Sequence, residues 1–288
     1  MDKIVGLVYD RLRWEEKVLA KEGRDNGLKV EMIDAKMLRL SSEDSFEEVK
    51  NTFGDIVLQR CISHYRGLHL TAYLENCGMD VINSFDVASI CGNKFLTSLA
   101  LKKKGVPTPK TFLAFTQEAA LELLDEAGLP LVMKPVTGSW GRMVVPLRDR
   151  ETAQAMIEMR AEMNNPLDHL FYIQEMVKRP GRDIRIIVVG GEVVVAVYRY
   201  APDNEWRTNV ARGGKSELCP IDRELEEIVL KAADAMGGGV LGVDAMESPE
   251  GIVVHEVNNT VEFKGAASVS ETNIPKAIME YVIHRMKR

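Results

Sequence analysis

The sequence is poor in cysteine and contains no long apolar run. Its 288 residues include four cysteines, which lie far apart and form no Cys-x-x-Cys pair. That spacing fits neither a zinc site nor a disulfide framework, so we expect buried, reduced thiols in a cytoplasmic protein. No apolar run approaches the roughly 20 residues that a membrane-spanning helix needs, and the N-terminus lacks the layout of a signal peptide. We therefore expect no membrane partner.

The chain also lacks an excess of positive charge and a recognisable catalytic nucleophile. The formal net charge is −6 at pH 7, whereas binding to a nucleic-acid backbone needs a positive surface. We therefore expect no nucleic-acid partner. The Gly-x-Ser-x-Gly elbow of serine hydrolases is absent, and no candidate nucleophile has a base beside it. These absences argue against covalent catalysis by a protein nucleophile.

The alternation of strands and helices predicts the domain organisation. Over residues 1–85 the two alternate, which predicts a small parallel α/β domain. A helix is expected over Asp86–Lys104, closed by Gly105, and compact α+β units follow. Gly190-Gly191, between two apolar runs, is a strong signal for a two-residue hairpin. We place three domains along the chain, at residues 1–90, 91–173 and 174–288.

Three polar residues interrupt two apolar strands near the C-terminus. Glu256 and Asn258 are two residues apart on one predicted strand, so their side chains share a face. Asp244 lies on the preceding strand and is expected alongside them. Two carboxylates and an amide oxygen suit Mg²⁺, which is usually shared with nucleotide phosphates. The alternative is a solvated sheet face, but three such residues in apolar strands are costly unless a cation matches them.

A glycine-containing loop and two lysines point to phosphate. Gly138-Ser139-Trp140-Gly141-Arg142 lies between two predicted strands, and its amides can cradle a phosphate, although a plain hairpin is the alternative. This loop matches neither the P-loop nor the dinucleotide fingerprint. Lys134 lies inside an apolar strand, where a lysine requires an anion. Lys94 begins a helix, and a phosphate there would be favoured by the lysine and the helix dipole together.

Two further groups of residues are compatible with a nucleotide site. Gln174-Glu175-Met176-Val177 is a strand end whose backbone and carboxylate can bind an adenine edge and a ribose. Arg185 and Arg199 lie in apolar strands and must meet a carboxylate or a phosphate. Such arginines would neutralise a γ-phosphate or an acyl phosphate as charge develops. The alternative is an internal salt bridge with Asp183 or Glu262.

Taken in chain order, these features resemble the ATP-grasp fold. In that fold two α+β units clamp ATP behind a smaller N-terminal parallel α/β (pre-ATP-grasp) domain, and the resemblance spans essentially the whole chain. More narrowly, the sequence is similar to the LysX-type ligases of lysine and arginine biosynthesis, which are relatives of the RimK ligases. The segments that carry this similarity are Leu7-Val8-Tyr9-Asp10-Arg11-Leu12-Arg13, Gly138-Ser139-Trp140-Gly141-Arg142, Pro180-Gly181-Arg182-Asp183-Ile184-Arg185, Asn209-Val210-Ala211-Arg212-Gly213-Gly214 and Glu256-Val257-Asn258-Asn259-Thr260-Val261-Glu262-Phe263-Lys264.

The resemblance implies a role for each group of residues. An ATP site would be formed by Lys94, Lys134, Gly138, Ser139, Trp140, Gly141, Arg142, Met143, Gln174, Glu175, Met176, Val177, Asp183 and Asn209. Two Mg²⁺ ions would be held by Asp244, Glu256 and Asn258. The amino-acid site would be lined by Arg199, Val210, Ala211, Lys264, Gly265, Ala266, Ala267 and Ser268. Arg185 and Arg199 would act in catalysis.

The resemblance also implies a reaction and a partner. The C-terminal glutamate of LysW, a small acidic carrier protein, would be phosphorylated, and the α-amino group of an amino-dicarboxylic acid would then attack it. No protein nucleophile is required, and catalysis would come from positioning and charge neutralisation. A cytoplasmic homodimer or homotetramer is expected.

One pair of residues departs from the family pattern. After Phe-Lys, the family carries Asn followed by Thr or Asn for α-aminoadipate, and Gly-Phe for glutamate. Here the pair is Gly265-Ala266, which matches neither. Gly265 favours glutamate, whereas Ala266 leaves a space where Phe would shorten the pocket, so we hypothesise that α-aminoadipate fits and that glutamate also reacts.

Three alternatives stay open at this point. The chain could be a ligase for glutamate and LysW alone, or a RimK-like glutamate ligase that acts on another protein or a cofactor. It could also be a regulatory ATP-binding module without activity, because a fold does not determine a function. Against the last alternative, a module that binds without turnover can lose Glu256 or Asn258, and both are present.

Overall fold

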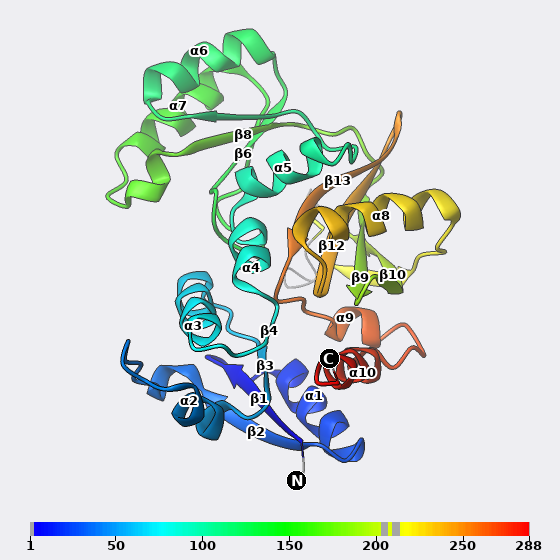
Figure 1. Cartoon of the computed structure of the whole chain (residues 1–288). Coiled ribbons are helices and arrows are strands. Elements are labelled where there is room, and N and C mark those ends of the chain that lie inside the picture. Colours follow the sequence, from blue (N-terminus) through cyan, green and yellow to red (C-terminus); the bar gives the residue numbers. More distant parts are fainter. Residues whose placement is uncertain (1–2, 203–206, 209–213, 288) are drawn as a thin grey trace.

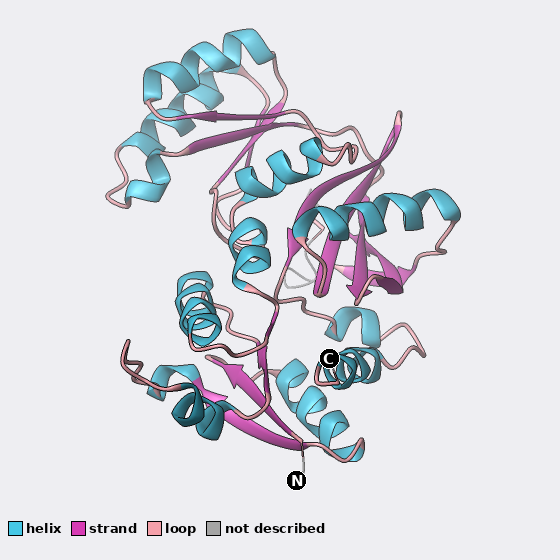
Figure 2. Cartoon of the chain, in the orientation of Figure 1, coloured by secondary structure: helices cyan, strands magenta, loops and turns pink. Residues whose placement is uncertain are grey.

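The N-terminal part of the chain is a four-stranded parallel sheet with helices around it. The computed structural model describes residues 3–202, 207–208 and 214–287 (Figures 1 and 2). The strand order is β2-β1-β3-β4, and all neighbouring strands run in parallel. Its elements are β1 (Ile4–Tyr9), α1 (Trp14–Asp25), β2 (Lys29–Asp34), the 3₁₀ helix η1 (Ala35–Met37), α2 (Phe46–Phe53), β3 (Ile56–Gln59), α3 (His64–Asn76) and β4 (Val81–Ile82). The parallel α/β domain expected from the sequence is thus confirmed.

Local sequence signals account for these elements. The central strand β1 is an apolar run because both of its faces are covered, and Val5 and Val8 are fully buried. Ser45 caps α2, since its side chain accepts from the Glu48 amide while the Glu48 carboxylate accepts from the Ser45 amide. Gly54 ends that helix with a φ of 87°, a backbone conformation that favours glycine.

The segment after the first sheet differs from the single helix expected over Asp86–Lys104. The structure has two helices, α4 (Phe85–Cys91) and α5 (Lys94–Lys103), with a break at Gly92 and Asn93. The Asn93 side chain accepts hydrogen bonds from the amides of Phe95 and Leu96, so it caps a new helix. The prediction of one continuous helix was wrong because this capping signal was overlooked, whereas the expected helix start at Lys94 is confirmed.

The central part of the chain is a second, antiparallel sheet that carries helices on one face. The strand order is β5-β8-β6-β7. Its elements are β5 (Thr111–Ala114), α6 (Gln117–Ala127), β6 (Leu131–Lys134), β7 (Val145–Leu147), α7 (Arg150–Ala161), η2 (Pro166–His169) and β8 (Phe171–Glu175). Leu124 and Ile157 of the helices pack on Phe171 and Ile173 of the sheet, all buried. Figure 1 shows this unit at the top of the molecule.

The third sheet has five strands in the order β11-β10-β9-β12-β13, paired in antiparallel fashion. The predicted hairpin at Gly190-Gly191 is confirmed, and both glycines have positive φ, as a tight two-residue turn requires. The elements of this part are β9 (Arg182–Val189), β10 (Glu192–Tyr200), β11 (Lys215–Leu218), α8 (Arg223–Met236), β12 (Val240–Ser248), β13 (Gly251–Asn258), α9 (Lys264–Ala267) and α10 (Ile274–Arg285).

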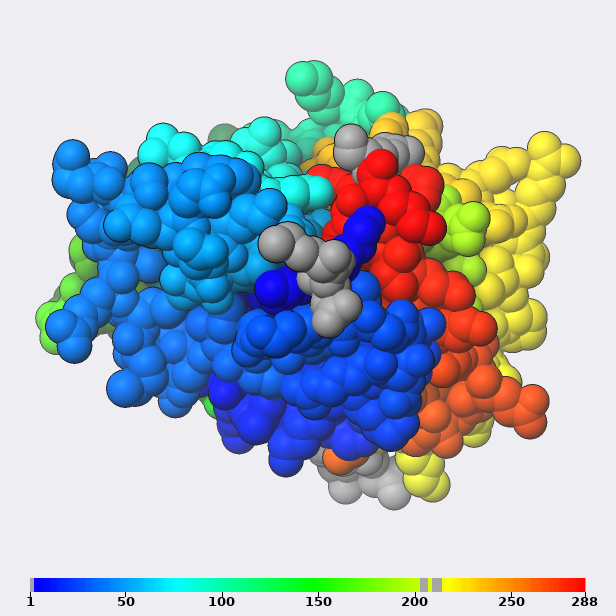
Figure 3. Space-filling view, turned by 60° about the horizontal axis from the view of Figure 1, so that its bottom comes forward, coloured from blue at the N-terminus to red at the C-terminus, as the bar shows by residue number. Residues whose placement is uncertain are grey.

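The C-terminal helix returns to the N-terminal sheet. α10 packs along α1 and against β9 and β10, and Ile278 and Met279 are buried in a core that also contains Val5 and Leu7. Figure 3 shows the C-terminal segment in red beside the blue N-terminal segment. Helices α4, α5 and α8 cover the opposite face of the five-stranded sheet. None of the helices in the described ranges combines the length and apolarity that crossing a bilayer demands. The domain limits at residues 90 and 173 stay predictions.

Candidate active site

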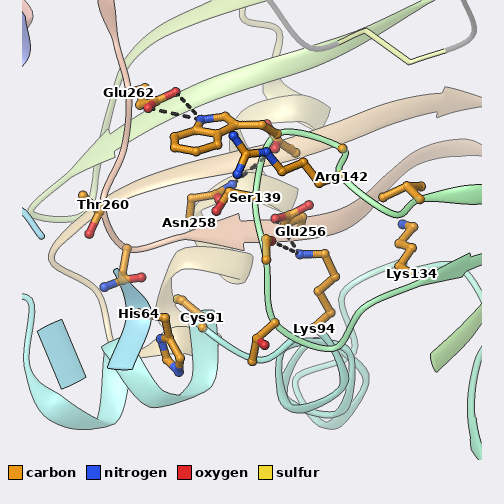
Figure 4. Close-up of a pocket in the computed structure, with 18 of the residues that line it drawn as sticks. His64, Cys91, Lys94, Lys134, Ser139, Arg142, Glu256, Asn258, Thr260 and Glu262 are labelled. Carbon is orange, nitrogen blue, oxygen red and sulfur yellow. Dashed lines mark hydrogen bonds and ion pairs between the residues drawn. The ribbon is translucent and has the colours of Figure 1, made fainter. Parts of the chain in front are cut away.

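A cleft of about 1110 Å³ lies where the three sheets meet. Residues from the N-terminal part, from the glycine loop and from β12 and β13 line it (Figure 4). Most residues proposed from the sequence for ATP, metal and amino acid are among them, although they come from segments more than 100 positions apart. The lining residues from those predictions are Lys94, Lys134, Gly138, Ser139, Trp140, Gly141, Arg142, Met143, Gln174, Glu175, Met176, Val177, Asp183, Arg185, Arg199, Asp244, Glu256, Asn258, Lys264, Gly265, Ala266 and Ser268.

Lys94 joins the glycine loop to the C-terminal strands. Its ammonium donates to the carbonyl oxygen of Gly138 at 2.8 Å and to Glu256 Oε1 at 3.1 Å (Figure 4). Helix α5 places the side chain here because the Lys94 amide is held by the Val136 carbonyl oxygen at 2.8 Å. A cation at a helix N-terminus that faces a glycine loop is suited to a phosphate, because both the lysine and the helix dipole attract the anion.

Lys134 is buried in β6, with 8% of its surface exposed. Its ammonium donates to Gln174 Oε1 at 2.7 Å, and the Gln174 amide donates to the hydroxyls of Tyr172 and Thr111. Burial is the main cause that lowers the pKa of Lys134 to about 8; Glu256 opposes this effect, and the nearby Lys94 adds to it. The lysine thus has a neutral hydrogen-bond partner in the sheet, which leaves its charge available for an anionic ligand.

Asp244 is the centre of a buried ion-pair network. Arg185 binds both of its oxygens, at 2.5 and 2.9 Å, and Arg199 reaches the same carboxylate at 3.0 Å. The strand register causes this arrangement, since Asp244 lies directly opposite Arg185 on β9. Arg199 also pairs with Asp183, which faces it across the β9–β10 ladder, at 2.8 Å. Asp183 accepts from the hydroxyl of Thr208 as well.

This network bears on two predictions. The internal salt bridge considered for the arginines is present between Arg199 and Asp183, and Arg185 pairs with Asp244 instead. Burial alone would raise the pKa of Asp244, but Arg185 and Arg199 outweigh that effect and hold it below the ordinary value. Asp244 therefore stays ionised. Its role as a metal ligand and that of Asp183 at the nucleotide stay predictions.

Glu256 and Asn258 lie beside Asp244 and complete a set of oxygen donors. Glu256 is the cross-strand neighbour of Asp244, and the amide of Asn258 donates to Asp244 Oδ2 at 3.3 Å. Two carboxylates and one amide oxygen on neighbouring positions of β12 and β13 fit the hard, oxygen-rich coordination of Mg²⁺. The described residues contain no group of three or more His, Cys, Asp or Glu residues that could hold a metal ion, and the set here has two carboxylates and an amide.

The strand end at Gln174–Val177 borders the cleft on the side of the central sheet. The backbone of Glu175 is fixed by the Lys110 carbonyl oxygen at 2.9 Å, whereas its side chain is exposed. Met176 and Val177 also line the cleft. This segment lies in the same cleft as Lys134, which is hydrogen-bonded to Gln174, so the hypothesis that it holds the base and the ribose stays a prediction.

The segment Lys264–Ser268 forms the opposite end of the cleft. Helix α9 begins at Lys264, whose amide donates to Glu15 of the N-terminal domain at 3.3 Å. Ala266 is buried, with 4% of its surface exposed, and Gly265 and Ser268 also line the cleft. Ala267 packs against the hydrophobic core rather than lining the cleft. Asn209, Val210 and Ala211 lie outside the described residues.

No site role was predicted for Arg13 or His255, and Glu262 was considered only as a salt-bridge partner of Arg185 or Arg199. Arg13 and Glu262 form an ion pair at 2.8 Å across 249 positions, so no local pattern indicates it. His255 is the extra residue of a bulge opposite Asp244 and Ala245, which turns it into the cleft beside Glu256. Burial and the adjacent Lys134 lower the pKa of His255, and within the described part of the chain both ring nitrogens lack a partner. The sequence signal that could have identified His255 is its position as a polar residue within an apolar strand.

The cleft lies between two antiparallel sheets and is lined by a glycine loop, two lysines and two carboxylates. This arrangement is that of an ATP-grasp protein. The sequence profile of the RimK-like ATP-grasp domain matches residues 91–282, and that of the LysX pre-ATP-grasp domain matches residues 5–90. The chain belongs to the RimK-like ATP-grasp family and carries the LysX-type N-terminal domain. The fold predicted from the sequence is confirmed.

Individual relatives agree with this assignment. The chain is 40% identical to an α-aminoadipate–LysW ligase LysX of Sulfurisphaera tokodaii, over 99% of this chain and 98% of that protein. It is 37% identical to a glutamate–LysW ligase ArgX of the same organism, over 96% of this chain and 97% of that protein. Among solved structures, a RimK-domain ATP-grasp protein of Sphaerobacter thermophilus superimposes with a TM-score of 0.76 at 22% identity, covering 97% of this chain and 99% of that one.

Proposed function

We propose that this chain is an ATP- and Mg²⁺-dependent ligase that joins an amino-dicarboxylic acid to the C-terminal glutamate of a LysW-like carrier protein. The observation that carries the proposal is one continuous cleft. At one end it holds Lys94, the glycine loop and Glu256, which suit ATP phosphates and metal, and at the other end it holds Ala266. Relatives that resemble the chain over almost its full length are named as ligases that use LysW.

The chemistry follows from the side chains of the cleft. A carrier carboxylate would attack the γ-phosphate, ADP would leave, and the α-amino group would displace phosphate from the resulting acyl phosphate. Lys94 and Lys134 would hold the phosphates, and Gln174–Val177 would hold the adenine and ribose. Arg185 and Arg199 would supply positive charge where the acyl phosphate forms. Asp244, Glu256 and Asn258 would hold two Mg²⁺ ions, which polarise phosphoryl oxygens when bound.

The residue that supports a choice of amino acid is Ala266. Its methyl group is the whole side chain at a buried position of the cleft wall. A larger side chain there would shorten the cleft, so the alanine is consistent with α-aminoadipate, which is one methylene longer than glutamate. We propose α-aminoadipate as the preferred substrate and glutamate as a second one. A homodimer or homotetramer stays a prediction.

The test is the mass of the carrier. The chain is incubated with a LysW-like carrier, ATP and Mg²⁺, and with α-aminoadipate or glutamate in separate reactions. The proposal predicts that the carrier gains one amino-acid residue and that the gain disappears in Asn258→Ala. An unmodified carrier in every reaction would contradict the proposal. Gain of mass with glutamate alone would overturn the substrate preference and keep the ligase.

A further inference from the structure

Glu262 lies where the three parts of the chain meet. Its carboxylate accepts a hydrogen bond from Arg13 of the N-terminal part at 2.8 Å. It also accepts from the indole N–H of Trp140, in the glycine loop of the central part, at 3.2 and 3.3 Å. Figure 4 shows this contact above the loop, on the side of Asn258 and Thr260. Through Glu262, the glycine loop thus contacts the end of the cleft that is formed by the segment Lys264–Ser268.

The Arg13 side of this contact is rigid. Arg13 binds both oxygens of Glu16, a fully buried residue of α1, at 2.7 and 3.1 Å. Glu16 in turn accepts from Arg60, which donates to the Val261 carbonyl oxygen next to Glu262. A carboxylate held by such a chain of buried ion pairs has little freedom to move, so Glu262 is a fixed acceptor at the edge of the cleft.

The loop side carries backbone strain. Trp140 has a φ of 62°, a conformation that a bulky side chain rarely adopts without compensating contacts. The guanidinium of Arg142 lies 4.9 Å from the Trp140 ring, and the indole is directed to Glu262. Two other contacts hold the same loop, Lys94 at the Gly138 carbonyl oxygen and Arg207 at the Gly141 carbonyl oxygen. The indole contact joins the loop to Glu262, two residues before the segment that begins at Lys264.

We propose that Glu262 is a positioning residue that holds the glycine loop closed through Trp140 and so protects the acyl phosphate from water. This proposal rests on the proposed function. With the loop open, the oxygen of a water molecule would bond to the carboxyl carbon, the bond from that carbon to the phosphate oxygen would break, and phosphate would leave. The carrier carboxylate would be regenerated and one ATP would be consumed without an amide. The side chain of Glu262 is 39% exposed, so the Trp140 indole can leave this fixed acceptor toward solvent when the loop moves.

The experiment measures ADP released for each carrier molecule that gains an amino acid. The variants are Trp140→Phe, which keeps the ring and loses the N–H, Glu262→Gln, and the double variant. Trp14→Phe is the matched control, because Trp14 also lines the cleft and its ring packs edge-on against Phe263, a contact that phenylalanine can keep. Melting temperatures of all variants verify that they are folded.

The proposal expects a ratio near one in the wild type and in Trp14→Phe. Loss of a hydrogen bond to a charged group favours loop opening by about tenfold, so Trp140→Phe should raise the ratio several-fold. Glu262→Gln keeps an acceptor oxygen but loses the charge, so it should raise the ratio by less. The double variant should match Trp140→Phe, because without the indole N–H the side chain at position 262 has no contact with the loop left to lose. A ratio near one in both single variants, with only the rate reduced, would overturn the proposal. An unmodified carrier with the wild type would instead refute the proposed ligase function.

Discussion

Replacing Asp244 by asparagine separates the two functions that the structure combines at this residue. The carboxylate is 4% exposed and neutralises Arg185 and Arg199, whose side chains are 15% and 8% exposed. Removal of one partner from a buried ion pair costs about 3–5 kcal/mol, because the remaining charge is left uncompensated. Arg199 keeps Asp183, so we expect the lower end, about 3 kcal/mol of unfolding free energy.

Glu256→Gln is the matched comparison. Among the described residues the ion-pair partner of Glu256 is Lys94, and their side chains are 22% and 10% exposed. Loss of this more accessible pair should cost about 1 kcal/mol. Both substitutions remove one negative oxygen donor from the proposed metal site, so both should abolish Mg²⁺-dependent ADP release. Only Asp244→Asn should also lower stability strongly.

The assay is denaturant unfolding at neutral pH together with ADP release over a Mg²⁺ titration. Because the pKa of Asp244 is held below its ordinary value, its stabilising contribution is complete above the unfolded pKa of about 3.9 and is lost as pH falls through the folded pKa. The difference between the variants should therefore be fully present at pH 7. Equal stability of Asp244→Asn and wild type would refute the ion-pair account. Normal Mg²⁺-dependent turnover in Glu256→Gln would refute the metal site.

Three further predictions concern other parts of the chain. The pKa of Lys134 is lowered to about 8, so the affinity for ADP should fall as pH rises above 8 in the wild type and stay constant in Lys134→Arg. Calorimetric titration with ADP from pH 7 to 9 measures this. A wild-type affinity that does not change with pH would contradict the prediction. Ala266→Phe should lower the rate with α-aminoadipate relative to the rate with glutamate by about tenfold or more, the effect of one methylene in a pocket. The two rates are compared in a reaction that contains both amino acids. Unchanged relative rates would show that this residue does not limit the length of the pocket. The Asn83 side chain accepts from the Val240 amide and donates to the carbonyl oxygens of Val240 and Asn259, at 2.7–2.8 Å. Asn83→Ala should therefore lower the free energy of unfolding, measured with denaturant, by about 3 kcal/mol. A loss below about 0.5 kcal/mol would show that these backbone groups find other partners.

The parts of the site that follow local rules were predictable from the sequence. Glu256 and Asn258 share a face because side chains alternate along a strand, and both line the cleft. Lys134 was identified because a lysine within an apolar strand is anomalous, and it is buried as that anomaly implies. Asp244 lies opposite Glu256, as expected for neighbouring strands joined by a turn.

The remaining features depend on non-local geometry. The bulge that turns His255 into the cleft breaks the strict alternation on which the strand prediction relied. The pairing of Arg13 with Glu262 needs the packing of the N-terminal part against the C-terminal segment, which no spacing along the chain encodes. The partner of Arg185 is decided by the β9–β12 register, which pairs it with Asp244, whereas the sequence analysis considered Asp183 or Glu262.

The most direct test of the proposed reaction follows the oxygen atoms of the carrier. The carboxylate of the C-terminal glutamate is labelled with oxygen-18, and the labelled carrier is incubated with the chain, ATP, Mg²⁺ and α-aminoadipate. Formation of an acyl phosphate predicts that the released inorganic phosphate carries one labelled oxygen for each amide formed. Amide formation with unlabelled phosphate would contradict the proposed acyl-phosphate route.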